Sequence, residues 1–267
     1  MRRTGRKTLR PPRIERASRS EKPRSVMKKP PKKSPRASKK GAGASKGSTE
    51  RVLQADGHSI RCIESGQGNP VVVIERPGGT SPSVLASLLA NEFRVIALEM
   101  PPPLHSSAKA EAVLTREMAR TLDRAVAAAG LERYVLVARS VNVPAALWQA
   151  IEGNERVEAL VLIAPKGLVA DGRSAANGIE QDRELERRLE EIKVPTLVLL
   201  GTNEEMVPHE MARTYAQRIP TSYVVLVYDA GEEIETERPE ALLGVLRDFV
   251  ERREKFVVNS SGTAINP

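Results

Sequence analysis

The chain has 267 residues, enough for one sizeable domain and an additional segment, and its formal net charge is +8. No stretch approaches the roughly 18 consecutive apolar residues of a membrane-spanning helix. A single cysteine, Cys62, excludes an intrachain disulfide. These features favour a reducing compartment, and we expect a cytoplasmic protein without a membrane span.

The positive charge is confined to one end of the chain. Residues 1–50 hold 18 lysines and arginines against 3 acidic residues, a net +15, whereas residues 51–267 hold 24 basic and 31 acidic residues, a net −7. The first segment also has six prolines and no aromatic residue. It cannot bury enough apolar surface to offset the entropy of ordering, so residues 1–50 are predicted to be a disordered basic tail. No apolar stretch follows its basic start, which argues against a secretory signal.

This tail is expected to bind polyanions such as nucleic acid. Contacts to phosphates would dominate, and without aromatic rings the tail has no platform on which bases stack. In anisotropy titrations, a peptide of residues 1–50 should bind DNA with a log–log salt slope approaching roughly −0.9 per phosphate contacted. An affinity that ignores salt, or a strong preference among DNA sequences, contradicts this prediction. A tail that only improves solubility is the alternative.

Residues 51–258 alternate short β-rich runs with helical stretches. Two strands, at 51–54 and 59–64, flank Ala55-Asp56-Gly57, a hairpin signal. Further strands are predicted at 71–74, 94–98, 134–138, 157–164, 196–200 and 223–227, and helices at 83–91, 115–129, 144–151, 183–192, 208–219 and 240–253. The pattern predicts an α/β fold with a mostly parallel sheet, helices on both faces and an opening β-hairpin. Residues 259–267 read as a frayed C-terminus.

Three segments, each after a predicted strand, carry potentially reactive residues. They are Ala138-Arg139-Ser140-Val141-Asn142, Gly201-Thr202-Asn203-Glu204 and Gly231-Glu232. Their chain order, a serine turn, an acid and a loop behind a glycine, resembles the α/β-hydrolase family. The resemblance covers roughly residues 51–256 and implies that fold, with a short lid between the strands at 157–164 and 196–200.

The resemblance also assigns roles to individual residues. Ser140 takes the nucleophile position of a Gly-x-Ser-x-Gly turn, which Asn142 should make more crowded than glycine does. Glu204 takes the position of the acid that orients the histidine. Glu232 replaces the catalytic histidine itself. We expect Glu232 to face Glu204, so that repulsion raises the pKa of one of the two carboxyls.

The oxyanion hole of this family needs two N–H donors, and the resemblance assigns them to Val141 and to the position of Pro77. Proline has no backbone N–H, so the second donor is missing unless the register slips by one residue to Gly78. Two elements of the catalytic apparatus, the base and one donor, are therefore expected to be absent.

A serine hydroxyl needs a neighbouring proton acceptor before it can attack a carbonyl carbon. The three histidines are His58, His105 and His209, and His105, in the loop after the strand at 94–98, is the nearest candidate. We interpret the chain as a catalytically degenerate hydrolase, a pseudoenzyme that acts as a binding or scaffold module for an unidentified protein or small molecule. One alternative is an active serine esterase that uses Ser140, Glu204 and an unusual base such as His105. The other is a protein tethered to nucleic acid by its tail. No cofactor and no metal are expected in any of them.

Overall fold

The structure is a computed structural model that describes residues 47–75, 82–101, 108–153, 155–166, 168, 182–204, 209–256 and 263–266. The predicted basic tail lies outside these residues up to position 46. Its last two residues, Thr49 and Glu50, are already part of the first strand. The description below therefore concerns the compact unit that spans residues 44–267.

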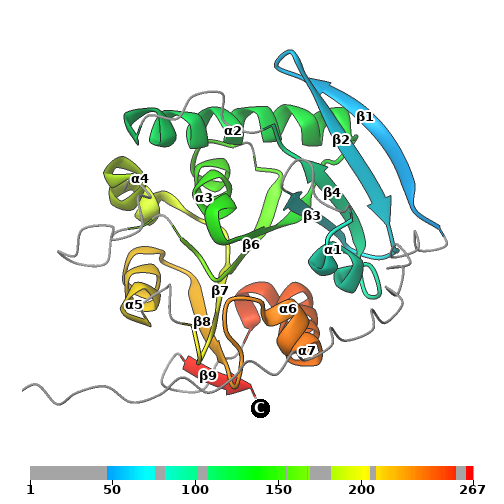
Figure 1. The fold of residues 1–267 in the computed structure, drawn as a ribbon. Helices are drawn as coiled ribbons and strands as arrows, with labels where there is room; N and C mark the ends of the chain where they lie inside the picture. The colour runs from blue at the N-terminus through cyan, green and yellow to red at the C-terminus, as the bar shows by residue number, and fades with distance from the viewer. Residues whose placement is uncertain are drawn as a thin grey trace, which may run out of the picture. The chain divides into compact units, whose positions relative to one another are not determined.

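Nine strands in the described ranges form one sheet in the order β1-β2-β4-β3-β5-β6-β7-β8-β9 (Figure 1). Their bounds are β1 Thr49–Ala55, β2 His58–Ser65, β3 Pro70–Glu75, β4 Arg94–Glu99, β5 Tyr134–Arg139, β6 Val157–Ile163, β7 Thr196–Gly201, β8 Ser222–Val227 and β9 Thr263–Asn266. The β1–β2 and β2–β4 pairs are antiparallel and the others are parallel. The predicted α/β fold with an opening hairpin is confirmed. The segment expected to fray differs, because it contains β9, which pairs with β8.

Local sequence signals explain where the first elements turn and end. Asp56 and Gly57 have φ angles of 50° and 76°, the left-handed pair that a two-residue hairpin turn requires. Gly130 has a φ of 77° and its N–H donates to the carbonyl of Ala127, as expected of the glycine that follows a helix. The helix before it, α2, begins at Ala108, seven residues earlier than predicted.

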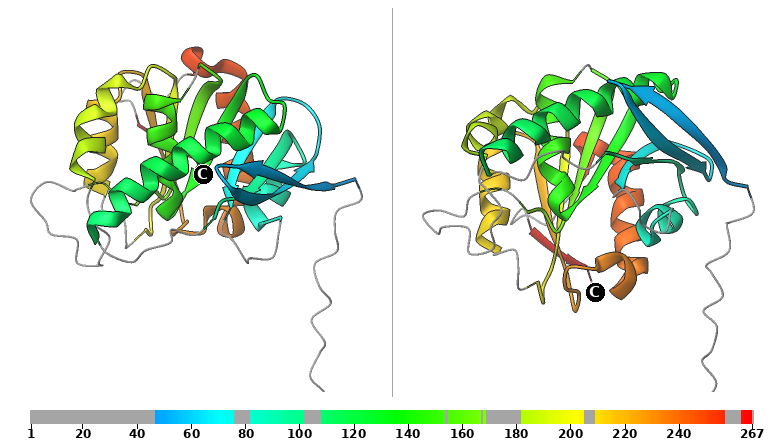
Figure 2. Two further views of the ribbon diagram at one scale, coloured as in Figure 1. Left: turned by 90° about the horizontal axis from the view of Figure 1, so that it is seen from above. Right: turned by 45° about the horizontal axis from the view of Figure 1, so that its top comes forward.

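Helices cover both faces of the sheet, and the strands alternate between two cores. The helices are α1 Val84–Leu89, α2 Ala108–Ala128, α3 Val143–Glu152, α4 Arg183–Arg188, α5 His209–Arg218, α6 Ile234–Glu237 and α7 Pro239–Arg252. Buried side chains of α2, α3, α4 and α5 share one core with strand residues such as Leu136 and Leu160. Those of α1, α6 and α7 share the other with neighbours such as Val135 and Val161. Figure 2 shows helices on both faces of the sheet. Successive residues of a central strand point into different cores, so both faces of the strand are buried. The sequences of these strands are therefore continuous apolar runs.

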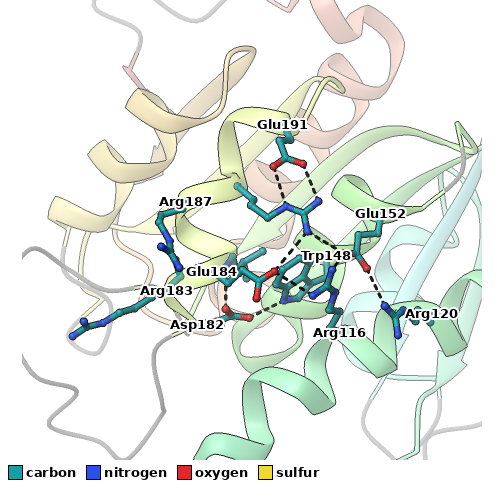
Figure 3. Close-up of polar contacts among 11 residues, drawn as sticks. Arg116, Arg120, Trp148, Glu152, Asp182, Arg183, Glu184, Arg187 and Glu191 are labelled. Atoms are coloured by element: carbon teal, nitrogen blue, oxygen red, sulfur yellow. Dashed lines mark hydrogen bonds and ion pairs between the residues drawn. The ribbon is translucent and has the colours of Figure 1, made fainter.

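A cluster of five residues joins α4 to α2 and α3, and consists of Arg116, Trp148, Glu152, Asp182 and Arg188. We call it the Trp148 cluster. Figure 3 shows the contacts around Trp148. The indole N–H of the buried Trp148 donates to Asp182 at 2.7 Å, and Asp182 in turn caps α4 through the N–H of Leu185 at 2.9 Å.

Arginines complete this cluster from two helices. The guanidinium carbons of Arg116 and Arg188 lie 4.6 and 5.3 Å from the indole centroid. Both side chains also bond to Glu152, Arg188 at 3.0 Å. The hydrogen bond from Arg116 is the main cause that lowers the pKa of Glu152, so this carboxylate stays charged between the two cations. The cluster fixes the start of α4.

We expect the described domain to fold without the basic tail. Every strong apolar periodicity lies after residue 50, and β1 starts at Thr49, so deletion of residues 1–46 removes none of the sheet. Circular dichroism should show a cooperative melting transition close to that of the full chain. Deletion of residues 1–50 is the comparison, because it also removes two residues that pair with β2. Loss of the transition in the shorter deletion contradicts this domain boundary.

Candidate active site

Ser140 lies in a strained turn between β5 and α3. It has a φ of 53°, is almost fully buried, and starts a 3-10 turn that leads directly into α3. A left-handed conformation at a residue other than glycine costs about 1–3 kcal/mol and persists only where the surrounding structure imposes it. A serine held in this way at the end of a strand is the geometry of a nucleophile elbow.

Asn142 explains how the turn closes without a glycine. Its backbone is helical, with a φ of −83°, so the position does not require glycine's conformational freedom. Its side-chain amide donates to the carbonyl of Ile74 at 3.1 Å. Ile74 lies one residue beyond the last position at which β3 pairs with β5, so Asn142 ties the end of β3 to the elbow. The larger side chain contributes a hydrogen bond here and does not block the turn.

The hydroxyl of Ser140 donates to a carboxylate. Its Oγ lies 3.1 Å from Oε1 of Glu232, and the same oxygen accepts a hydrogen bond from Nζ of Lys166 at 2.7 Å. The backbone N–H of Lys166 donates to the carbonyl of Ser140 at 3.3 Å. Ser140, Glu232 and Lys166 therefore form a connected triplet.

Lys166 is the main group that lowers the pKa of Glu232. Burial raises the pKa of Glu232, but the hydrogen bond and charge of Lys166, the hydrogen bond from Ser140 and the charge of Arg139 together outweigh it. The net result is a pKa below the ordinary value of a glutamate. Glu232 is therefore an ionised acceptor at neutral pH.

Arg139 fastens the loop after β8 to the elbow. From the end of β5 its guanidinium reaches Glu233 at 3.2 Å and the buried Glu235 at 2.9 Å. Burial raises the pKa of Glu235, and the charge of Arg139 opposes that rise without cancelling it. Glu232 directly precedes Glu233 in the chain. The two ion pairs of Arg139 therefore hold the segment that carries Glu232 close to Ser140.

A second connection joins the turn after β7 to the loop that carries Glu232. The N–H of Asn203 donates to the carbonyl of Ala230 at 2.8 Å. At Gly201 a side-chain carbon would lie only 2.0 Å from the same carbonyl, so close packing of the two loops requires glycine there. Glu204 follows in this turn and is buried.

Comparisons with known proteins agree with the α/β-hydrolase fold. The serine hydrolase family matches residues 107–232. A 2-hydroxy-6-oxo-6-(2'-aminophenyl)hexa-2,4-dienoic acid hydrolase of Metapseudomonas resinovorans is 24% identical over 269 residues, covering 76% of this chain and 91% of that protein. Among solved structures, a serine hydrolase involved in carbazole degradation has a TM-score of 0.61 at 21% identity, over 76% of this chain and 99% of that chain. A carboxylesterase of Bacillus subtilis has a TM-score of 0.58 at 18% identity, over 76% of this chain and 91% of that chain.

This protein has the α/β-hydrolase fold. Its relatives are hydrolases by name, and the family match ends at Glu232, the position where the resemblance places a histidine. Within the described part of this α/β-hydrolase-fold protein, the hydrogen-bond partner of Ser140 is a glutamate held by a lysine.

The structure places the other predicted site residues as follows. Val141, the first assigned oxyanion donor, follows Ser140 in the turn and exposes its side chain. Pro77 and His105 lie outside the described residues, and so does Gly78. His58 starts β2, and β4 and β3 separate β2 from β5 in the sheet. His209 is the first residue of α5.

One sequence expectation, a carboxyl pKa raised by repulsion between Glu232 and Glu204, does not hold at Glu232. Instead Lys166 contacts Glu232 and the pKa of Glu232 is lowered. No motif points to Lys166, which is 66 residues from Glu232 in the chain. Only its place two residues after the strand at 157–164, at the same sheet edge as Ser140, could have suggested it.

Among the described residues, no group of three His, Cys, Asp or Glu side chains has the arrangement of a metal site, and no helix is long and apolar enough to cross a membrane. Among the described residues, the hydrogen-bonded triplet at the elbow offers one hydroxyl, one carboxylate and one ammonium group.

Proposed function

We propose that this α/β-hydrolase-fold protein is a binding or scaffold module whose serine site does not carry out the usual acyl transfer. The observation that supports this is the hydrogen bond from Ser140 to Glu232, at 3.1 Å. A general base works best when its pKa is close to the working pH. A carboxylate whose pKa lies below the ordinary glutamate value accepts the serine proton far too weakly for that task.

The Lys166 ion pair strengthens this proposal. In a serine hydrolase the base must gain a positive charge or lose a negative one as it takes the proton. Here protonation of Glu232 would leave the ammonium group of Lys166, only 15% exposed, beside a neutral acid. The ion pair therefore opposes the proton transfer on which nucleophilic attack depends.

Covalent labelling by a fluorophosphonate, followed by peptide mapping, tests the proposal. We expect no adduct on Ser140 of the unmodified protein within times that label an ordinary serine hydrolase completely. A serine hydrolase of known activity, treated in parallel, shows that the reagent is competent. Stoichiometric modification of Ser140 contradicts the proposal.

The second candidate is an active serine hydrolase acting on esters or related acyl compounds. The strained elbow favours it, since a φ of 53° at Ser140 is retained although a silent site has no need of the strain. In this case Glu232 would act as the base, or His105 would approach Ser140 from outside the described residues. Labelling that disappears in Glu232→Gln favours the first of these bases, and labelling that disappears in His105→Ala favours the second.

A further inference from the structure

Lys166 contacts both partners of the serine hydrogen bond. Its ammonium group donates to the oxygen of Glu232 that also accepts from Ser140, at 2.7 and 3.1 Å respectively. Its backbone N–H donates to the carbonyl of Ser140 at 3.3 Å. Lys166 is thus bonded to the elbow through its backbone N–H and to the loop after β8 through its ammonium group.

The fold holds a second strained residue that directs Lys166 to this place. Ala164, at the end of β6, is fully buried and has a φ of 43°. Its N–H donates to the carbonyl of Leu199 in β7 at 2.9 Å, which anchors the strained residue in the sheet. β5 and β6 are neighbours, so the two left-handed residues, Ser140 and Ala164, lie at adjacent strand ends. Strain of this kind collects where a structure must aim a side chain.

The charged groups around Glu232 leave Lys166 as its main counter-ion. Arg139 also lowers the pKa of Glu232, but the guanidinium of Arg139 is bonded to Glu233 and Glu235. Burial raises the pKa of Glu232, so without Lys166 the neutral acid would be favoured more strongly.

We propose that Lys166 is a positioning residue whose ion pair with Glu232 makes this carboxylate a weak proton acceptor toward Ser140. This inference rests on the proposed function, in which the serine is silent. It adds that the low reactivity of Ser140 depends on Lys166, which lies outside the positions of the serine, the acid and the histidine. Removal of the ammonium group should make Glu232 a stronger proton acceptor while its hydrogen bond to Ser140 remains in place.

Titration of the Glu232 carboxyl tests this directly. Infrared spectra of protein labelled with 13C-glutamate, subtracted from those of Glu232→Gln, isolate this group. In Lys166→Met the midpoint should rise by roughly one pH unit or more, the size of shift that a close opposite charge produces. Lys166→Arg should stay near the wild type because it keeps the charge. Lys193→Met removes an exposed lysine outside the triplet and should leave the titration midpoint of Glu232 unchanged.

Labelling of Ser140 is the second readout. As the fluorophosphonate reacts, an Oγ–phosphorus bond forms, fluoride leaves and the serine proton passes to Glu232. We expect Lys166→Met to label several-fold faster than wild type at pH 8, and the gain to vanish in the double variant Lys166→Met/Glu232→Gln. Lys166→Gln, which keeps a donor but not the charge, gives the same comparison if the methionine variant does not fold.

The outcomes separate the two proposals. An unchanged Glu232 midpoint in a folded variant without the ammonium group overturns the role of Lys166 and leaves the silent serine untouched. Slower labelling in Lys166→Met than in wild type also overturns it, since Lys166 would then assist Ser140. Rapid labelling of the unmodified protein overturns the proposed function, whatever the titration shows.

Discussion

We expect hydrolysis of small activated esters by the unmodified protein to be the same before and after Ser140→Ala. A positioned general base is worth roughly 10²–10⁴ in rate, and an ionised carboxylate held by Lys166 supplies little of it. Release of p-nitrophenol from p-nitrophenyl acetate measures this. A background rate that survives Ser140→Ala is expected, and a rate that falls with the serine contradicts the prediction.

Replacing Glu232 by histidine should restore part of the missing catalysis. The imidazole would take the place from which the carboxylate now accepts the Ser140 hydrogen bond, and Glu204 holds the acid position in the resemblance. Lys166 would disfavour a protonated imidazole, so Lys166→Met should increase the gain. Pro77→Gly should add more if that residue is the second oxyanion position, because a missing donor costs roughly 10²–10³.

Glu233→His is the matched control for this rescue. Glu233 is the next residue, is exposed, and bonds to Arg139 instead of Ser140. A histidine there should give no serine-dependent activity and no fluorophosphonate adduct. Equal activity of the two variants would mean that a histidine anywhere on this loop suffices, which the Ser140–Glu232 geometry does not allow.

The sheet and most helices were predictable because their signals are local and periodic. Continuous apolar runs such as Val71–Ile74 are buried on both faces, and Gly130 ends α2 where the pattern stops. α6, Ile234–Glu237, has four residues and three of them are polar, so no period is visible. β9 is a short edge strand whose pairing to β8 depends on tertiary contact.

Some residues of the candidate site were likewise predictable from local sequence signals, and others were not. The turn around Ser140 and the replacement at Glu232 follow from chain order and flanking strands. Lys166 does not, because its contact depends on the left-handed Ala164 and on the order of strands in the sheet. Asn142 likewise bonds to a carbonyl 68 residues away, so its effect on the turn needs three-dimensional information.

The largest loss of stability is expected at the centre of the Trp148 cluster. Trp148 is only 1% exposed, and truncation of a buried aromatic side chain to alanine typically costs about 3–5 kcal/mol. The same change removes the surface on which Arg116 and Arg188 lie. Urea unfolding followed by circular dichroism should show this drop in Trp148→Ala. Lys193→Ala, outside the cluster, should stay within about 0.5 kcal/mol of wild type.

A double-mutant cycle separates the polar part of this loss from the apolar part. Trp148→Phe keeps most of the ring but removes the N–H that donates to Asp182 at 2.7 Å, leaving a buried acceptor unpaired at a cost of about 1–3 kcal/mol. Asp182→Asn keeps an oxygen that can still cap α4 through Leu185. If the indole bond holds α4 in place, the two substitutions together should cost less than the sum of the single changes. Strict additivity would mean that the indole contributes through packing alone and that the N–H bond does not stabilise the start of α4.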